Sequence, residues 1–426
     1  MTSVKESTLP EVFFADGEQP GSEAWWLGMA HRGLPMVISE SNGLKHTLFL
    51  WRERPQQKLR TVYIDVYSHT PHPVREAPTQ MQRVGNTDIW YWQTALPKNW
   101  CGSYFFMPLE ESDAPMPTSS GERRRWWKDM IKHRASADPF NPIPPHNGAW
   151  VEPLSGIYPD NVHWLHLEPQ GALRKIRWSS PRLGNTRDIW LYRTGDDQSS
   201  EAENLPLVIL LDGNYWSTQD HLFGELDIRT RAGDLPAALY LLIDSVAPET
   251  RDRELPCNPE FWLALQEELL PEVSALEPVT DKGELTLLAG QSYGGLSALW
   301  AALRWPHRFG LSLSQSGAFW WPVAAMANSS RESEQGNRRE KRLSDWVQNS
   351  FRGDPQSRKQ PRFLVEVGSY EDLLIDDNRA TRDVLLQQGF SVEYREFPGG
   401  HDWLCWRRSL VEGIVALIGN TAVPHH

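Results

Sequence analysis

Two hydrophobic patterns divide this chain of 426 residues into two parts. In the first part, short segments rich in β-branched and aromatic residues are separated by Gly, Pro and Asn, which is typical of strands joined by turns. Residues 61–67 alternate in the manner of a strand with one buried face. The predicted strands cover residues 46–52, 60–67, 88–94 and 102–107. This succession of short strands predicts a small all-β sandwich of the immunoglobulin-like type.

The second part carries longer continuous apolar runs, which are typical of strands buried on both faces of a parallel sheet. Stretches of helical propensity, such as residues 259–270 and 379–388, lie between most of these runs. The alternation predicts a mostly parallel sheet with helices on both faces. The predicted buried strands cover residues 207–211, 238–243, 285–289, 310–314 and 362–367, and the predicted edge strands cover residues 174–179 and 186–192.

A change of pattern separates the two parts. Residues 138–145 are rich in proline, so they can form neither a helix nor a central strand, and the regular spacing of strands weakens around them. We therefore expect an N-terminal sandwich domain over residues 1–170 and an α/β domain over residues 171–426.

Three stretches fall outside the regular patterns. Residues 1–40 are expected to form a loose lead-in, with Trp25 and Trp26 as an anchor onto the first domain. Residues 122–132 predict a short helix with a basic, solvated face, and the polar, charge-dense residues 329–342 predict a surface loop.

Composition and charge argue against several classes of protein. The formal net charge of −12 is opposite to the basic excess of nucleic-acid-binding proteins. The longest apolar runs are too short to cross a bilayer, and residues 1–20 lack the basic start and apolar stretch of a secretory signal. Cys101, Cys257 and Cys405 have neither the number of a disulfide framework nor a metal-ligand spacing. We expect a cytoplasmic protein without a metal or cofactor, and without a nucleic-acid or membrane partner.

The motif that carries chemistry is Gly-Gln-Ser-Tyr-Gly at residues 290–294. Such a pentapeptide alone is also found in ordinary glycine-rich turns. Here it follows a predicted strand and precedes a helical stretch, which is the strand–turn–helix pattern of the nucleophile elbow in α/β-hydrolases. Ser292 is therefore the predicted nucleophile. Because the turn is strained and crowded, side chains at Gly290 and Gly294 are expected to clash.

The general base is expected to be a histidine that follows the nucleophile in the chain. His307 lies at the far end of the helix that leaves the turn, so it is predicted to be a surface residue. His401 lies in a glycine-rich loop after the strand-like residues 391–397, where this fold presents its histidine. His401 is therefore the predicted general base.

The acidic partner of the histidine is expected on the loop after residues 362–367. A carboxylate there would fix the tautomer of the imidazole and stabilise the imidazolium. Glu371 is our choice, Asp372 is the alternative, and Asp376 and Asp377 are further candidates.

The oxyanion is expected to bind two backbone N–H groups. The first belongs to Tyr293, directly after the nucleophile. The second belongs to Gly213 or Asn214, in the loop after the early strand at residues 207–211. Gly213 is equally compatible with a simple tight turn.

Beyond the elbow, an ordered set of segments resembles the enterochelin (ferric enterobactin) esterases, and the resemblance covers nearly the whole chain. The resembling segments are residues 81–83, 87–92, 99–104, 210–213, 254–258, 261–264, 290–299, 313–317 and 399–407. The resemblance implies an immunoglobulin-like domain followed by an α/β-hydrolase domain. It also implies hydrolysis of enterobactin, a cyclic triester of 2,3-dihydroxybenzoylserine, so that iron is released in the cytoplasm.

The resemblance also bears on individual residues. The nucleophile, acid and histidine of the family fall on Ser292, Glu371 and His401. The polar loop near residue 330 is longer than in the family. Ferric enterobactin is a trianion with catechol rings, so arginines and tryptophans are expected to bind it. Our choices for substrate contacts are Arg251, Trp216 and Arg187, with Trp320, Trp321 and Arg407 as further candidates.

Two other functions are compatible with the same residues. One is a carboxylesterase of different specificity, of the feruloyl or acetyl esterase type, with an accessory ligand-binding β-domain. The other is a binding protein that keeps the hydrolase fold without its activity. Such a protein would be expected to have lost Ser292 or His401, and both are present.

Overall fold

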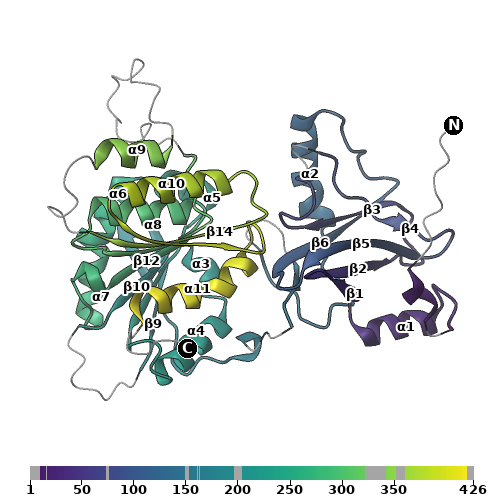
Figure 1. Ribbon diagram of the computed structural model, residues 1–426, viewed down its shortest axis with the longest axis horizontal. Helices are drawn as coiled ribbons and strands as arrows, with labels where there is room; N and C mark the ends of the chain where they lie inside the picture. The colour runs from purple at the N-terminus through teal and green to yellow at the C-terminus, as the bar shows by residue number, and fades with distance from the viewer. Residues whose placement is uncertain are drawn as a thin grey trace. The chain divides into compact units, whose positions relative to one another are not determined.

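The computed structural model consists of two compact units (Figure 1). It describes residues 10–419 except for residues 16, 73–75, 149–152, 161, 163, 196–203, 322–341 and 352–359. The first unit comprises residues 1–160 together with 398–404, and the second comprises residues 161–397 together with 405–426. The predicted polar loop at residues 329–342 lies outside the described residues except for Arg342.

Two antiparallel sheets form the first unit. The larger has the strand order β1-β2-β5-β4, and the smaller has the order β3-β6-β7. The sheets meet through aromatic side chains: Phe49 contacts Tyr104, and Trp51 contacts Phe106, with ring centroids 5.1 and 5.4 Å apart. The strands are β1 (Met36–Ser41), β2 (Leu44–Arg52), β3 (Leu59–Val66), β4 (Gln82–Arg83), β5 (Ile89–Pro97), β6 (Gly102–Glu110) and β7 (Ser155–Ile157).

Helices cover the outer faces of both sheets. Helix α1 (Glu23–Arg32) buries Trp25 and Trp26 in one hydrophobic cluster, and α2 (Ser120–Arg134) contributes to another. The predicted anchor role of Trp25 and Trp26 is confirmed, because their buried rings hold α1 against the larger sheet. The prediction of a loose lead-in was wrong for the described residues 10–40, which form η1, α1 and β1, with β1 paired to β2. A short 3₁₀ helix, η1 (Glu11–Phe14), precedes α1.

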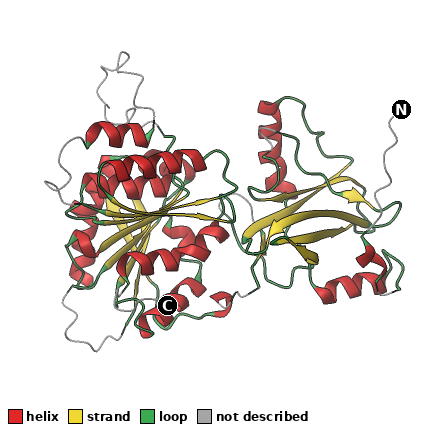
Figure 2. Ribbon diagram, viewed as in Figure 1, coloured by secondary structure: helices red, strands yellow, loops and turns green. Residues whose placement is uncertain are grey.

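A single eight-stranded sheet organises the second unit (Figure 2). Its strand order is β15-β14-β13-β12-β10-β11-β9-β8, and the strands from β15 to β11 pair in parallel, whereas β9 and β8 are antiparallel. The strands are β8 (Arg174–Ser180), β9 (Asn185–Arg193), β10 (Leu207–Leu210), β11 (Leu239–Ile243), β12 (Thr286–Gln291), β13 (Leu311–Gln315), β14 (Arg362–Gly368) and β15 (Ser391–Phe397).

Helices pack on both faces of this sheet, with α8 and α10 on one side and α4 and α11 on the other (Figures 1 and 2). The unit therefore has the α/β-hydrolase-like architecture that the alternation of apolar runs and helices predicts. The helices are α3 (Gly213–Trp216), α4 (Asp220–Arg231), α5 (Pro248–Glu254), α6 (Pro259–Ala264), α7 (Leu270–Leu276), α8 (Tyr293–Arg304), α9 (Leu343–Ser350), α10 (Ile375–Gln387) and α11 (Trp403–Ile418). Shorter turns are η2 (Trp164–His166), the π-helical η3 (Leu265–Leu269) and η4 (Gly283–Leu285).

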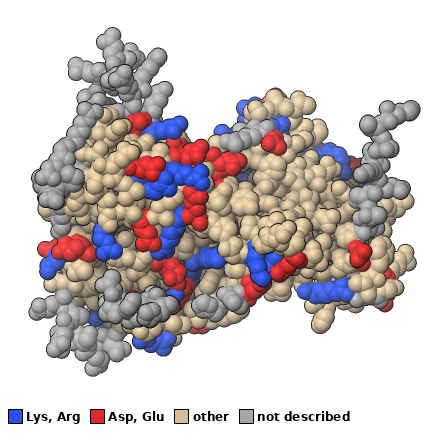
Figure 3. Space-filling view, in the orientation of Figure 1, with Lys and Arg blue, Asp and Glu red and all other residues tan. Residues whose placement is uncertain are grey.

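The charged surface of the second unit is mixed in sign. Over α10 and the neighbouring edge of the sheet, acidic and basic side chains are interspersed (Figure 3). Ion pairs account for part of this pattern, including Arg379 with Glu396 at 2.7 Å and Arg395 with Glu393 at 2.6 Å. Within the described residues, no helix is both long and apolar enough to cross a membrane.

Candidate active site

The predicted nucleophile lies in a strained turn between β12 and α8. Ser292 has φ 56° and ψ −116°, a backbone conformation that residues with a side chain rarely adopt. Strand β12 ends at the residue before it, and α8 begins at the residue after it. This is the strand–turn–helix geometry that the motif predicts, and it places Ser292 beyond the carboxyl end of a central strand.

The glycines of the turn differ in how much space surrounds them. A Cβ atom at Gly290 would lie 2.4 Å from backbone atoms of Gly294, so only glycine fits there. A Cβ atom at Gly294 would meet nothing closer than 3.5 Å, so the expected clash at Gly294 was wrong. The second crowded position is Gly295, where a Cβ atom would lie 2.6 Å from Ser314 Oγ, because α8 crosses β13 closely at that residue.

Backbone hydrogen bonds fix the turn to the neighbouring strand. Ser292 N donates to Gln315 O at 3.0 Å, and Ala318 N donates to Ser292 O at 3.0 Å. Both backbone polar groups of the predicted nucleophile are therefore paired, one with the last residue of β13 and the other with the segment that follows it. Such pairing stabilises a conformation that is unfavourable in isolation.

A buried chain of side-chain amides lies beneath the turn. Trp216 Nε1 donates to Gln291 Oε1 at 3.2 Å, and Gln291 Nε2 donates to Gln315 Oε1 at 2.8 Å. Gln315 Nε2 in turn donates to Glu366 Oε2 at 3.1 Å. Burial raises the pKa of Glu366, with hydrogen bonds from Ser409 and Gln315 acting in the opposite direction. Because these buried polar groups are hydrogen-bonded to one another, they form a satisfied network that supports the turn.

Two helices begin beside each other near Ser292. Strands β10 and β12 pair in parallel, with Leu210 opposite Ala289; α3 then begins at Gly213 and α8 at Tyr293. The first N–H groups of a helix have no intrahelical partner and carry partial positive charge. The N–H groups proposed for the oxyanion, those of Tyr293 and of Gly213 or Asn214, therefore belong to two helix starts on adjacent strands.

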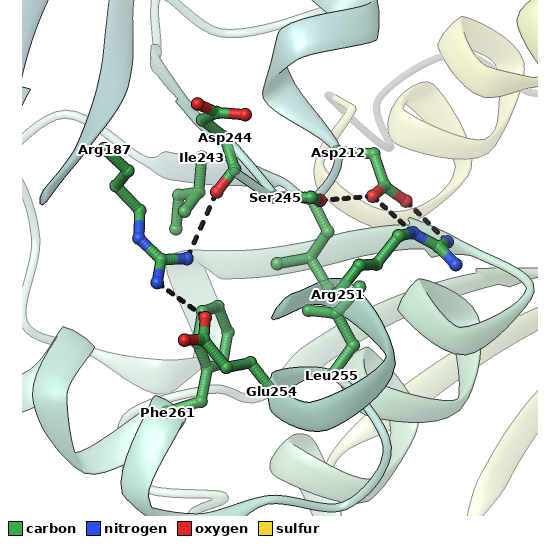
Figure 4. A pocket seen from close by; sticks show the side chains of 10 residues that line it. Arg187, Asp212, Ile243, Asp244, Ser245, Arg251, Glu254, Leu255 and Phe261 are labelled. Atoms are coloured by element: carbon green, nitrogen blue, oxygen red, sulfur yellow. Dashed lines mark hydrogen bonds and ion pairs between the residues drawn. The ribbon is translucent and has the colours of Figure 1, made fainter. Parts of the chain in front are cut away.

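An acidic residue that sequence reasoning did not single out fixes this arrangement. Asp212 has a left-handed backbone, and its carboxylate binds three donors (Figure 4). Its Oδ1 atom accepts from Ser245 Oγ at 2.5 Å and from Arg251 Nε at 2.6 Å, and its Oδ2 atom accepts from Arg251 Nη2 at 2.8 Å. Its place directly after a buried strand was the signal that could have revealed it.

Arg251 links this carboxylate to the nucleophile turn. Its Nη2 atom also donates to Gln291 O, directly before Ser292, at 3.2 Å. Burial opposes the charge of the guanidinium, but the Asp212 carboxylate outweighs that effect, so the pKa of Arg251 lies above its ordinary value. Arg251 is therefore a fixed cation beside the turn.

The predicted acid lies on the loop after β14. Glu371 is buried, and its Oε1 atom accepts from Ser316 Oγ at 2.5 Å and from Gly368 N at 2.8 Å. Trp406 Nε1 donates to the same Ser316 hydroxyl at 2.8 Å. Asp372, the alternative, is exposed. Burial and defined hydrogen bonds suit Glu371 to a fixed carboxylate, and its catalytic role stays a prediction.

The predicted general base lies in residues 398–404, the segment that packs with the first unit. His401 N donates to Ser68 Oγ at 2.9 Å. The next residue, Asp402, accepts from Ser103 N at 2.7 Å and from Ser103 Oγ at 2.8 Å. The backbone of the predicted base is thus held by residues of the first unit, and its catalytic role stays a prediction.

The three residues chosen as substrate contacts differ in accessibility. Arg187 is 1% exposed and forms an ion pair with Glu254 at 2.5 Å, and Trp216 is completely buried. Their burial argues against the substrate contacts predicted for them. Arg251 is partly exposed, so it can reach a ligand, and its role as a substrate contact stays a prediction. Arg407, a further candidate, is 1% exposed and pairs with Glu225 at 2.9 Å.

The hollow between Arg187 and Arg251 is small (Figure 4). It has essentially no room for a water molecule, because its own side chains fill it, among them the Arg187–Glu254 and Arg251–Asp212 pairs. This hollow does not admit a ligand with three aryl rings. Among the described residues, no group of three or more His, Cys, Asp or Glu side chains is placed to hold a metal ion.

Comparison with known proteins identifies related families for both parts of the chain. Residues 46–159 match the family model described as "Enterochelin esterase, N-terminal", and residues 181–417 match the model described as "Putative esterase". An iron(III) enterobactin esterase from Dickeya dadantii is 36% identical over 416 residues, which cover 93% of this chain and 92% of the relative. One from Escherichia coli K12 is 35% identical over 410 residues, covering 93% and 96%.

Solved structures show the same relationship. The enterobactin esterase from Shigella flexneri, crystallised in the presence of enterobactin, has a TM-score of 0.76 and 34% identity, covering 93% of this chain and 98% of its own. The ferric enterobactin esterase from Salmonella typhimurium has a TM-score of 0.77 and 36% identity over the same shares. The chain therefore belongs to the enterochelin esterase family.

Proposed function

We propose that this protein is a serine esterase that hydrolyses the ester bonds of enterobactin, in its apo or ferric form, to 2,3-dihydroxybenzoylserine units. Iron bound to the siderophore is released as a consequence. The observation that carries the proposal is the strained turn at Ser292, placed between a central strand and a helix in a chain of this family.

The proposed reaction assigns one task to each member of the triad. His401 removes the proton of Ser292 Oγ, which attacks a lactone carbonyl and forms an acyl-enzyme. His401 then protonates the departing serine oxygen and later activates water for deacylation. Glu371 orients the imidazole and stabilises its charged form. The buried position of Glu371 and its two hydrogen bonds support this assignment.

Charge that develops on the carbonyl oxygen is proposed to be stabilised by backbone N–H groups. Tyr293 supplies one of them, and Gly213 or Asn214 supplies the other. Donors placed where charge develops in the transition state contribute about 3 kcal/mol each. The bridge from Asp212 through Arg251 to Gln291 O supports the proposal, since it ties the start of α3 to the turn before α8.

The finer organisation of the protein is also part of the proposal. We assign residues 1–170 to an immunoglobulin-like domain and residues 171–426 to the catalytic domain. Two antiparallel sheets joined by aromatic contacts support the first assignment.

We place the reaction in the cytoplasm. The support is that all three cysteines are buried thiols, as expected in a reducing compartment.

The proposal is tested by incubating the protein with apo and ferric enterobactin and separating the linear trimer, dimer and monomer by liquid chromatography. Wild-type protein is expected to produce all or some of these products. Ser292→Ala is expected to abolish them while its circular dichroism spectrum and thermal unfolding stay unchanged. A wild-type protein that cleaves feruloyl or acetyl esters but not enterobactin would overturn the substrate, and an active Ser292→Ala variant would overturn the nucleophile.

A further inference from the structure

An aromatic cluster lies directly beside the proposed nucleophile. Tyr293 follows Ser292, and the segment after β13 returns to the same turn, where Ala318 N donates to Ser292 O. Trp320 and Trp321 follow Ala318 closely in the chain. The ring of Tyr293 lies 6.0 Å from that of Trp320 and 5.1 Å from that of Trp321, and the two tryptophan rings lie 5.5 Å apart.

Trp320 differs from the other tryptophans of the described chain in its exposure. Its side chain is 43% exposed, and in the described part of the protein no other tryptophan is among the exposed large hydrophobic residues. Leaving a large ring in water forgoes the free energy that its burial would provide. A ring held in place by two aromatic neighbours, yet open to solvent beside a nucleophile, is a ready surface for a planar ligand.

Arg251 supplies a polar group on the other side of Tyr293. Its guanidinium carbon lies 5.7 Å from the centre of the Tyr293 ring. Its Nε and Nη2 atoms bind Asp212 and Gln291 O, whereas its Nη1 atom has no acceptor among the described residues. The side chain is 19% exposed, so a donor remains available next to the aromatic cluster. The Asp212 carboxylate already has its charge balanced by the same guanidinium.

We propose that Trp320, Tyr293 and Nη1 of Arg251 form a subsite for one aryl ring of the substrate. The ring stacks on Trp320, and a phenolic oxygen accepts a hydrogen bond from Arg251. The ligand class is a ring that is both planar and rich in oxygen acceptors, such as a 2,3-dihydroxybenzoyl group. This inference rests on the proposed function, because it names the part of the ester substrate that the site recognises.

The test uses an inhibitor that carries the ring without an ester. Hydrolysis of methyl butyrate, which has no aromatic group, is the expected basal activity of the wild-type protein, and 2,3-dihydroxy-N-benzoyl-glycine is added as a competitor. Trp320→Ala and Trp320→Leu are expected to raise the inhibition constant about tenfold, since stacking on an aromatic side chain is lost. Trp320→Phe keeps a ring and is expected to stay within about threefold of the wild type.

Trp190 provides a matched control. It is a partly exposed tryptophan of β9, a strand paired with β8 and β11, and it contacts Lys175, with the ammonium 5.6 Å from its ring. Trp190→Ala is expected to leave the inhibition constant unchanged. Thermal unfolding of every variant is measured in parallel. A tenfold rise in Trp190→Ala as well, no inhibition of the wild type, or equal inhibition of Trp320→Ala and wild type would overturn the subsite.

A second measurement separates the failure of the subsite from the failure of the proposed function. The ratio of kcat/KM for enterobactin to kcat/KM for methyl butyrate is expected to fall about tenfold in Trp320→Ala. An unchanged ratio would overturn the subsite and leave the proposed function intact. Inhibition that depends on Trp320, in a protein that does not cleave enterobactin, would leave the subsite intact and overturn the proposed function.

Discussion

At the scale of single residues, Glu371 and Asp372 are neighbours with opposite surroundings. Glu371 is 4% exposed and accepts hydrogen bonds from Ser316 and Gly368, whereas Asp372 is exposed. Glu371→Gln is expected to lower kcat for ester hydrolysis by about 10²- to 10⁴-fold, because in the proposed triad the imidazolium of His401 would lose its carboxylate partner. Asp372→Asn is expected to stay within about twofold of the wild type. Steady-state kinetics of the two variants decide which carboxylate is the acid. A larger loss of kcat in Asp372→Asn than in Glu371→Gln would identify Asp372 as the acid.

The glycines of the nucleophile turn offer a second comparison. Gly290→Ala is expected to lower the free energy of unfolding by about 1–3 kcal/mol, because its methyl group would overlap the backbone of Gly294. Gly294→Ala places its methyl group at ordinary contact distance. Its free energy of unfolding is therefore expected to stay within about 0.5 kcal/mol of that of the wild type. Thermal unfolding of both variants measures the difference. Equal destabilisation would show that the two positions are crowded alike.

At the scale of elements, the sequence predicts the strands better than the supports of the site. The apolar runs predict β10 to β14 because strands buried on both faces need continuous hydrophobic residues. Helix α1 escaped prediction because the surface that buries Trp25 and Trp26 comes from strands later in the chain. The hydrogen bond between Gln291 and Gln315 could likewise not be predicted from the sequence, because only the pairing of β12 with β13 brings the two side chains together.

Ser316, which directly follows β13, could not be predicted for the same reason. Its hydroxyl donates to Glu371 and accepts from Trp406, and these partners come from different elements. Ser316→Ala removes both hydrogen bonds and leaves the Glu371 carboxylate less firmly held. We expect kcat to fall about tenfold, since a hydrogen bond to a charged group contributes about 1.5–3 kcal/mol.

Ser312, which lies within β13, is the matched control for Ser316, which directly follows that strand. Its hydroxyl is buried and has no hydrogen-bond partner within the described residues. Ser312→Ala is expected to keep both kcat and the unfolding temperature of the wild type, because no bond is lost. A loss of kcat of the same size in both variants would mean that the strand, rather than the contact with Glu371, determines activity.

At the scale of the whole molecule, the chain contributes distant segments to each unit. Residues 398–404 pack with the first unit although their neighbours in sequence belong to the second. Ser103 and Asp402, 299 positions apart, are joined by two hydrogen bonds, and His146 Nε2 lies 2.9 Å from the same Ser103 hydroxyl. The segment that carries His401 is therefore held by a buried polar cluster, whose ionisation should appear in the stability of the protein.

Asp402 is expected to make the free energy of unfolding depend on pH. It is 2% exposed, and burial raises its pKa to about 6, with hydrogen bonds from Ser103 acting in the opposite direction. In the unfolded chain an aspartate has a pKa of about 3.9. Between about pH 4 and pH 6 the folded protein therefore keeps a proton that the unfolded chain releases, so the free energy of unfolding falls as pH rises through this window. Integrated over the window, the effect is about 2–3 kcal/mol.

Asp402→Asn removes this titration. The free energy of unfolding of the wild type minus that of the variant is therefore expected to fall by about 2–3 kcal/mol from pH 4 to pH 6.5 and to stay level above it. Burial lowers the pKa of His146 to about 4, which gives a slope of opposite sign, but His146 is present in both proteins and its contribution largely cancels. Urea unfolding followed by tryptophan fluorescence at several pH values measures the difference. Asp372→Asn, the same change at an exposed carboxylate, should show no such slope, and a level difference for Asp402→Asn would mean that Asp402 is already ionised at pH 4 in the folded protein.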